Sequence, residues 1–291
     1  MRLALGLVLV LCAMTPAHAT YSVVATDSST RQVGGAVTSC VGTLSVSVVY
    51  GGVPGHGAVH AQAQLGGPGK NAAVMQLGMD LDPMAIITSI TNLSFDANAQ
   101  RRQYGVVDLM ARAAGFTGNQ ALAFADDRQA TVGTYTYSVQ GNILTSAAVL
   151  DNAAMSFQMQ GCDLADRLML ALEAGARNGE GDSRCTGGGI PSDSAFIEVD
   201  REGEAAGTYL RLDVTDTSPQ NPLVLLRTQF DAWRATHPCP SPPMPDAGAG
   251  GDAGTDPGDM MDGGCCSGAG GERAWPLVLV VALVLRRRRA R

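Results

Sequence analysis

Thr20 is the residue whose position offers chemistry most directly. It follows Ala17-His18-Ala19, and this Ala-x-Ala pattern is typical of a signal-peptide cleavage site. Cleavage after Ala19 would leave Thr20 with a free α-amino group beside its own hydroxyl. Such an amine titrates at about 8, so it can act as the general base for a weak hydroxyl nucleophile. The sequence therefore predicts a threonine nucleophile, with the first residue of an edge strand as the alternative.

The chain of 291 residues divides into four segments. Residues 1–19 are predicted to be a secretory signal peptide, because a basic residue precedes an apolar run too short to span a membrane. Residues 20–237 form one domain with a full core. Residues 238–264 form a linker rich in Pro, Gly and Asp, which cannot bury enough apolar surface to fold. Residues 265–291 are a sorting or anchor segment.

This last segment combines Cys265 and Cys266, a short apolar run and four consecutive arginines. The order resembles the C-terminal sorting signals of myxobacterial surface proteins. The resemblance implies cleavage near Cys265 or Cys266 and a domain displayed on the cell surface or outer membrane. The alternatives are a marginal transmembrane anchor and a secreted protein. In each case the domain is expected to be exported.

Acidic side chains outnumber basic ones by 27 to 20, which gives a net charge of −7 at pH 7. An acidic domain without basic clusters argues against nucleic acid as a partner. The expected partners are a small-molecule or peptide-like substrate and, through the tail, the membrane or cell envelope. The sequence carries none of the motifs GxSxG, HExxH, the phosphate loop or the dinucleotide fingerprint, and no cofactor is predicted.

Two histidines and the single lysine are further groups that could take part in chemistry. His56 and His60 lie four residues apart on one predicted strand and therefore on one face. Two histidines without a third ligand are too few for a zinc site, so no metal is predicted. Lys70 lies in a Gly-Pro-Gly-Lys-Asn turn and is expected at the surface.

Four of the seven cysteines, Cys40, Cys162, Cys185 and Cys239, belong to the exported domain and the residues just after it, where oxidation is permitted. They allow three pairings, and the sequence does not choose among them. We favour Cys162 with Cys185, because both flank one predicted helix and its loop. Cys40 would then pair with Cys239. The alternative is that one or more stay free and buried.

Hydrophobic periodicity predicts strands, two helices, strands, two helices, strands and a last helix. The expected strands are 21–26, 33–39, 44–50, 56–64, 104–109, 113–117, 135–140, 195–199 and 209–214, and the expected helices are 71–79, 83–93, 146–159, 163–177 and 221–236. Asp82 and Asp163 are typical capping residues at helix starts. This order favours an α+β fold in which helix layers cover two antiparallel sheets.

Several segments resemble the motifs of one bacterial family, the domain of unknown function 1028. In chain order they are TYSVVATD, GGAVTS, GAVHAQ, RRQYGVVD, GFTGN, YSVQGNIL, LADRLMLALEAG and GDSR. The family is grouped with the N-terminal nucleophile hydrolases, so the resemblance implies a four-layer αββα sandwich. It spans about residues 20–214. Departures from the pattern at Cys40, at His60 and around Cys185 leave the substrate unpredicted.

The resemblance also bears on the site. It supports Thr20 as the nucleophile, since the first residue often has this role in such folds. Gly141 and Asn142, at the end of the YSVQ strand, are the predicted oxyanion donors, with an ordinary turn as the alternative. Asp182 and Arg184 in the GDSR motif are candidates for contacts with the substrate or nucleophile, and a solvated charged loop is the alternative.

Two functional hypotheses follow. The first is an exported, surface-associated hydrolase of N-terminal nucleophile type, an N-terminal threonine amidohydrolase that cleaves an amide-like bond through Thr20. The second is a non-catalytic surface binding or structural module that keeps the fold. The sequence predicts neither the substrate nor the oligomeric state.

Overall fold

The computed structural model describes residues 20–239. The predicted signal peptide, nearly all of the predicted linker, and Cys265 and Cys266 lie outside the described residues.

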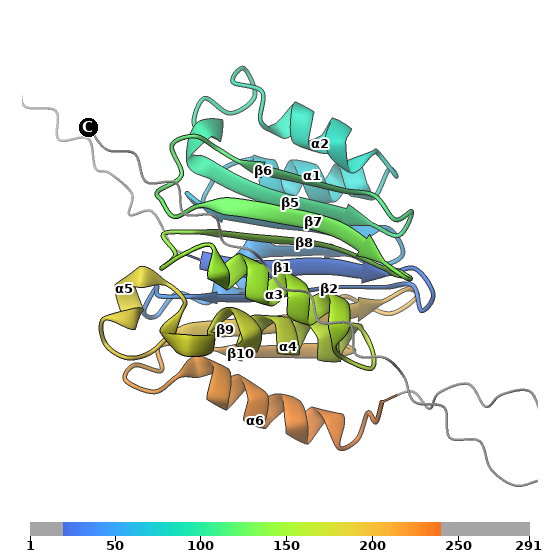
Figure 1. Ribbon diagram of the computed structural model, residues 1–291. Coiled ribbons are helices and arrows are strands. Elements are labelled where there is room, and N and C mark those ends of the chain that lie inside the picture. Colours follow the sequence, from blue (N-terminus) through green and yellow to red (C-terminus); the bar gives the residue numbers. More distant parts are fainter. Residues whose placement is uncertain (1–19, 240–291) are drawn as a thin grey trace, which may run out of the picture. The chain divides into compact units, whose positions relative to one another are not determined.

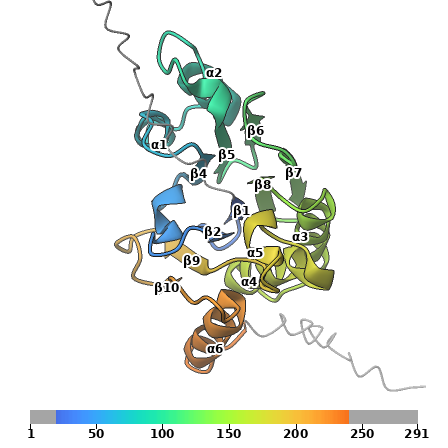
Figure 2. The same ribbon diagram turned by 90° about the vertical axis from the view of Figure 1, so that its left-hand side faces the viewer.

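Two antiparallel sheets stack face to face, and helices cover the outer face of each (Figures 1 and 2). The six-stranded sheet has the order β10 (Leu210–Val214), β9 (Ser194–Arg201), β2 (Gln32–Ser39), β1 (Thr20–Asp27), β8 (Tyr135–Asn142) and β7 (Asp126–Val132). The four-stranded sheet has the order β3 (Tyr50–Val53), β4 (Gly57–Ala63), β5 (Arg102–Asp108) and β6 (Ala113–Thr117). The predicted α+β sandwich with αββα layers is confirmed.

The helices divide between the two outer faces. Those against the four-stranded sheet are α1 (Gly69–Leu77) and α2 (Pro83–Ile90), and those against the six-stranded sheet are α3 (Ala148–Met159), α4 (Leu164–Gly175) and α6 (Pro222–Arg234). Asp82, Asp163 and Asn221 cap α2, α4 and α6, each accepting a hydrogen bond from a backbone N–H of the first turn. The capping predicted for Asp82 and Asp163 is confirmed.

Strand β1 contributes to two of the three apolar clusters, because its side chains alternate between faces. Tyr21, Val23 and Ala25 pack against α3 and α4, whereas Val24 packs between the sheets with Val37 and Phe196. All eight residues of β1 are buried. The strand is therefore enclosed on both faces.

One strand prediction was wrong, and one strand was not predicted. Residues 44–50 alternate in hydrophobicity, yet Val46–Val49 form a short 3-10 helix, η1, and only Tyr50 enters β3. Ser45 Oγ accepts from the backbone N–H of Ser47, and such a local bond competes with strand pairing. Strand β7 was missed because its sequence, DDRQATV, is polar, as suits an edge strand that is partly exposed.

The favoured disulfide pairing was also wrong. The bonds are Cys40–Cys185, with Cα atoms 5.9 Å apart, and Cys162–Cys239, with Cα atoms 5.8 Å apart. Cys162 precedes α4 and Cys185 follows it, so the length of this 12-residue helix, about 18 Å, separates them. Arg234 near the end of α6 pairs with Asp163, which brings Cys239 to Cys162.

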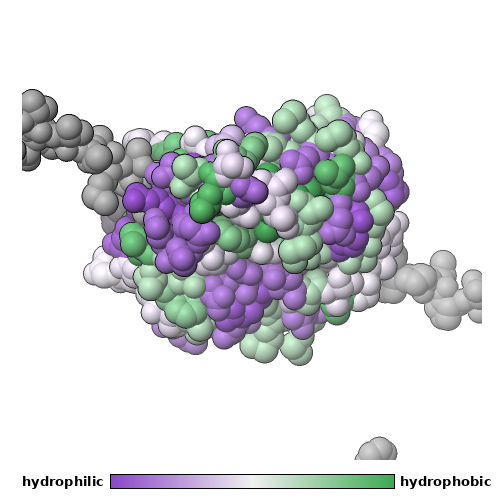
Figure 3. Space-filling view, turned by 90° about the horizontal axis from the view of Figure 1, so that it is seen from above, coloured by the Kyte–Doolittle hydropathy of each residue, from purple (hydrophilic) through white to green (hydrophobic). Residues whose placement is uncertain are grey.

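Exposed methionines lie on α1 (Met75), on α2 (Met84) and in the connection between them (Met79). Figure 3 shows apolar and polar residues interspersed on this side of the domain rather than one continuous apolar patch. In residues 20–239, no helix combines the length and apolar character needed to cross a bilayer.

A pair of buried carboxylates lies on β9, on its face toward the four-stranded sheet. Asp200 accepts from Tyr50 Oη at 2.9 Å and from the backbone N–H of Gly207 at 2.6 Å. Burial and the neighbouring charge of Asp200 raise the pKa of Glu198 to about 7, although its ion pair with Arg211 opposes the shift. A carboxyl with a raised pKa stabilises the fold at low pH, and this contribution is lost as pH rises from about 4.5 to 7.

Replacing Glu198 by Gln is therefore expected to stabilise the protein more at pH 8 than at pH 5. At pH 5 the native carboxyl is already neutral, like the amide. The free energies of unfolding in urea at the two pH values measure the difference. Glu204→Gln, at an exposed position in the same hairpin, is the control. An equal effect of Glu198→Gln at both pH values would contradict the prediction.

Candidate functional site

Thr20 begins β1, which lies between β2 and β8 in the sheet (Figure 1). The register pairs it with Ser39, the last residue of β2, and with Asn142, the last residue of β8. Cross-strand partners project from the same face, so these three side chains lie side by side. Val24, four residues along β1, faces the other sheet, and so does Thr20.

The hydroxyl of Thr20 lies beside another hydroxyl, since Oγ1 is 3.2 Å from Ser39 Oγ. Thr20 is 2% exposed and Asn142 is fully buried. Neither a serine hydroxyl nor an asparagine amide is a base at neutral pH. The predicted proton acceptor for Thr20, an α-amino group freed by cleavage after Ala19, stays a prediction.

Gly141 and Asn142 are strand residues, so the alternative interpretation as a turn was wrong. A Cβ on Gly141 would lie 2.6 Å from Leu144 Cδ1 and 3.1 Å from the carbonyl oxygen of Thr20. Glycine thus permits the close approach of β8 to β1. The Asn142 side chain shares the face of Thr20, and its role as an oxyanion donor stays a prediction.

Two buried glutamines of the four-stranded sheet support this end of β1. Gln62 Nε2 donates to the carbonyl oxygen of Thr20 at 3.3 Å and to Gln103 Oε1 at 2.8 Å. Gln62 Oε1 accepts from Ser22 Oγ at 2.7 Å, and Gln103 Nε2 donates to the carbonyl oxygen of Gly141 at 2.9 Å. Hydrogen bonds therefore join the two sheets beneath Thr20.

The GDSR segment encloses the same end of the sheet, where the short helix α5 (Ser183–Thr186) lies near the start of β1 (Figure 2). Asp182 is fully buried, and its Oδ2 accepts from the backbone N–H of Cys40 at 2.7 Å. Its Oδ1 caps α5 through the N–H of Arg184, whose Nη2 lies 2.9 Å from Oδ2. A β-bridge joins Asp182 to Leu144. The segment is thus attached to both neighbours of β1.

The alternative of a solvated loop was wrong for Asp182, because the carboxylate is buried and holds backbone groups in place. The Cys40–Cys185 bond adds a covalent link at the same position. Contacts of Asp182 and Arg184 with a substrate stay a prediction. Both residues lie at the Thr20 end of the sheet.

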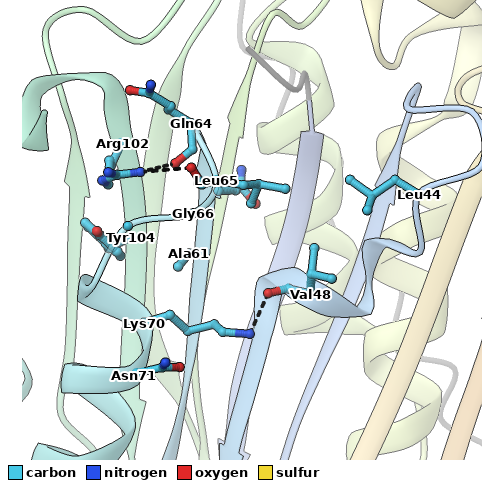
Figure 4. A pocket seen from close by; sticks show the side chains of 12 residues that line it. Leu44, Val48, Ala61, Gln64, Leu65, Gly66, Lys70, Asn71, Arg102 and Tyr104 are labelled. Carbon is cyan, nitrogen blue, oxygen red and sulfur yellow. Dashed lines mark hydrogen bonds between the residues drawn. The ribbon is translucent and has the colours of Figure 1, made fainter. Parts of the chain in front are cut away.

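A cavity of about 350 Å³ lies next to this end, between η1 and the start of α1 (Figure 4). Gln62, which contacts Thr20, forms part of its wall. Lys70 also lines it and is partly buried there, rather than lying fully exposed at the surface. Its Nζ donates to the carbonyl oxygens of Val48 at 2.6 Å and Tyr50 at 3.3 Å. Partial burial lowers the pKa of Lys70.

The two histidines do not converge. His56 lies just before β4 and its Nδ1 is 2.8 Å from Asp80 Oδ1, whereas His60 is fully buried between the sheets. Within residues 20–239, the groups of potential metal ligands each contain a disulfide, whose sulfur atoms are already bonded. His60 Nδ1 lies 3.3 Å from Gln140 Nε2, and its Nε2 has no hydrogen-bond partner among the described residues.

Sequence reasoning missed Ser39, Gln62 and Gln103 as parts of the site. Gln62 and Gln103 each lie in a recognised motif, GAVHAQ and RRQYGVVD, and each alternates with apolar residues along its strand. Polar residues at alternate positions are ordinarily assigned to a solvent face. Their presence in two motifs of the resembled family is the signal that could have identified them.

The fold and site define a class of protein: an αββα sandwich whose central strand begins with a buried threonine, beside a cavity between the strand edge and a helix. The chain belongs to the family of unknown function DUF1028, whose model matches residues 20–223. The crystal structure of a protein from Silicibacter pomeroyi, matched by the same family model, is similar with a TM-score of 0.60 and 23% identity. The similarity covers 74% of this chain and 89% of that chain. A comparison with curated proteins found no match.

Burial of His60 has a consequence for stability. Desolvation, with a further contribution from the charge of Lys70, lowers the pKa of His60 to about 3. In the unfolded chain this histidine binds a proton near pH 6.5, whereas in the folded chain it stays neutral. The contribution of His60 to the free energy of unfolding is therefore fully present above this pH and is lost as pH falls. Between pH 7.5 and pH 5 the loss is about 2 kcal/mol.

We expect His60→Gln to remove this loss, so that the free energy of unfolding of the variant falls less than that of the wild type between pH 7.5 and pH 5. Urea unfolding at both pH values measures it. His56→Gln, at the partly exposed histidine, serves as the matched control and should retain the pH dependence of the wild type. The same pH dependence in His60→Gln and in the wild type would refute the assignment.

Proposed function

We propose that this protein is an exported hydrolase of the N-terminal nucleophile type, which cleaves an amide-like bond through Thr20. One observation carries the proposal: Thr20 begins the central strand and shares one face with Ser39 and Asn142, above Gln62 of the cavity wall. The hydroxyl of Thr20 and the amide of Asn142 thus share one face, and Gln62 connects Thr20 to the wall of a cavity that could hold a ligand. The proposed chemistry requires no cofactor.

The mechanism begins after removal of residues 1–19. The α-amino group of Thr20 accepts the hydroxyl proton, directly or through a water molecule, as Oγ1 attacks the carbonyl carbon. The side-chain amide of Asn142, with the backbone of Gly141, stabilises the negative oxygen. The protonated amine then gives its proton to the leaving nitrogen. Water hydrolyses the resulting ester and regenerates Thr20.

Ser39 positions the nucleophile in this mechanism. Its hydroxyl, 3.2 Å from Thr20 Oγ1, orients the nucleophile without taking the proton. Gln62 holds the carbonyl group of the same residue. Both the hydroxyl and the backbone of Thr20 are therefore restrained before a substrate binds, which favours reaction by reducing the entropy to be lost.

Export to the cell surface or outer membrane is part of the proposal. The two disulfides support it, because such bonds form and persist in oxidising environments. The partners proposed are a small-molecule or peptide-like substrate and, through the tail, the cell envelope. Nucleic acid is not among them.

A non-catalytic surface module with the same fold is the second candidate. The observation that favours it is the burial of Thr20, which is 2% exposed and whose hydroxyl contacts another hydroxyl. In that case Thr20, Ser39 and Gln62 would serve only to join the strands and sheets.

The first test determines the mature N-terminus and then removes the nucleophile. N-terminal sequencing of the exported protein should begin at Thr20, and Thr20→Ala should lower hydrolysis of an amide panel by at least about a hundredfold. Thr20→Ser, which keeps a hydroxyl, should retain measurable turnover. The unfolding free energy of Thr20→Ala should change by only about 1 kcal/mol, since one hydrogen bond is lost.

Thr228→Ala is the matched control, because Thr228 lies exposed on α6 and its hydroxyl bonds only to its own helix. It should leave both turnover and stability unchanged. A mature chain that begins after Thr20, or equal turnover by wild type and Thr20→Ala, would exclude the hydrolase and favour the non-catalytic module.

A further inference from the structure

The cavity beside Gln62 follows an edge of the four-stranded sheet that β3 leaves uncovered. Strand β3 pairs with β4 only as far as Tyr50 with His60, whereas β5 pairs with β4 through Ala63. Beyond Tyr50 the chain belongs to η1 instead of extending β3. Ala61, the residue after the last pair, lines the cavity.

The backbone carbonyl of Ala61 points to this uncovered side. The carbonyl of His56 accepts from Leu109, on the β5 side, so the peptide N–H of Gly57 points to the β3 side. Residues of a strand alternate between its two neighbours, and Ala61 therefore faces away from β5, as Gly57 does. An acceptor for an amide N–H thus borders the cavity, one residue from Gln62.

Lys70 supplies a positive charge without a paired carboxylate. Its ammonium donates to two backbone carbonyls, which leaves one of its three N–H groups. None of the ion pairs formed within residues 20–239 includes Lys70. Figure 4 shows the side chain extending from α1 toward Val48 along the cavity.

The other cation of the cavity is already neutralised. Arg102 forms a buried ion pair with Asp96, and its Nη1 donates to the carbonyl oxygens of Gln64 at 2.5 Å and Leu65 at 3.3 Å. Figure 4 shows the guanidinium held against these two residues. Arg102 therefore forms part of the cavity wall with its charge neutralised by Asp96, whereas the charge of Lys70 can attract an anionic ligand.

The size and walls of the cavity limit the ligand further. About 350 Å³ is at the small end of ligand sites, which suits a molecule of about two or three small amino-acid residues. Leu44, Val48 and Leu65 contribute apolar surface, so short aliphatic side chains fit. A small anion with an amide N–H therefore matches the volume of the cavity, the charge of Lys70 and the carbonyl acceptor of Ala61.

We propose that this cavity is a subsite for a short peptide with a free carboxylate, in which the carboxylate pairs with Lys70 and a peptide N–H donates to the carbonyl of Ala61. The inference rests on the proposed hydrolase in one respect: the scissile amide would lie at the Gln62 end, next to Thr20. The carbonyl oxygen of Tyr50 accepts from Lys70, and Tyr50 pairs with His60 of β4. His60 lies two residues, or about 7 Å, along this strand from Gln62. A free carboxylate lies C-terminal to the scissile amide, so it would leave with the amine product. The short distance along β4 places it within two or three residues of that amide.

The test measures binding separately from turnover. The mature protein carrying Thr20→Ala is titrated by calorimetry with the tripeptide Ala-Ala-Ala and with its C-terminal amide. We expect the acid to bind at least about tenfold more tightly at low salt, because the amide lacks the charge. Lys70→Gln should abolish this preference and Lys70→Arg should retain it. Arg101→Gln, which removes an exposed charge nearby, is the matched control and should retain it too.

A spectroscopic measurement places the contact at Lys70 itself. Lys70 is the single lysine in the chain, so ¹⁵N-lysine labelling yields one side-chain ammonium signal. We expect the acid to shift this signal and the amide to leave it in place. Equal affinities for acid and amide, or an ammonium signal that does not move, would overturn the subsite.

Failure of the subsite differs from failure of the hydrolase. Tight, Lys70-dependent binding of the acid, without hydrolysis by the wild type, supports the subsite and rejects the hydrolase. Hydrolysis of amides through Thr20 with the same kcat/KM for acid and amide substrates, unchanged in Lys70→Gln, supports the hydrolase and rejects the subsite.

Discussion

The pairing of β1 on both sides is the interaction on which the rest of the structure depends. All eight of its residues pair with β2 on one side and with β8 on the other. A residue at the start of a strand ordinarily has few neighbours and frays. Here two ladders, the Gln62 amide and the Asp182 segment hold Thr20 in a fixed position. These contacts give the Thr20 hydroxyl a defined direction within the sheet.

The layer between the sheets is apolar in one part and polar in another. Around Val24, Val37 and Phe196 it is an ordinary apolar core, whereas toward Thr20 it consists of hydrogen-bonded serine and glutamine side chains. Buried amides are tolerated when their donors and acceptors are satisfied, and here they restrict the sheets to one relative register. His60 departs from this rule, because Nε2 lacks a described partner and the ring must stay neutral.

Local patterns were enough to predict most elements, the capping residues Asp82 and Asp163, and the layered fold. They failed where distant parts of the chain decide the outcome. A glutamine in an alternating strand has the same local pattern whether it faces water or another sheet, so Gln62 and Gln103 were not assigned. The disulfide pairing depends on the length of α4 and on where α6 ends, and neither is a property of the sequence around a cysteine. Ser39 was missed because its importance comes only from the register with Thr20.

The position of the Cys162–Cys239 bond has a mechanical consequence. Tyr21 Oη donates to the carbonyl of Leu172 near the end of α4, whereas Cys162 precedes the start of this helix, so the bond lies at the end of the domain away from Thr20. Tension applied to the chain beyond Cys239 would pass through the sulfur atoms into the α3–α4 turn. The covalent path of the force would bypass the segment between the two cysteines, which are 77 positions apart and enclose α4, α5, β9, β10 and α6. Such a domain can be held under load by its C-terminal side while the strand that carries Thr20 remains undisturbed.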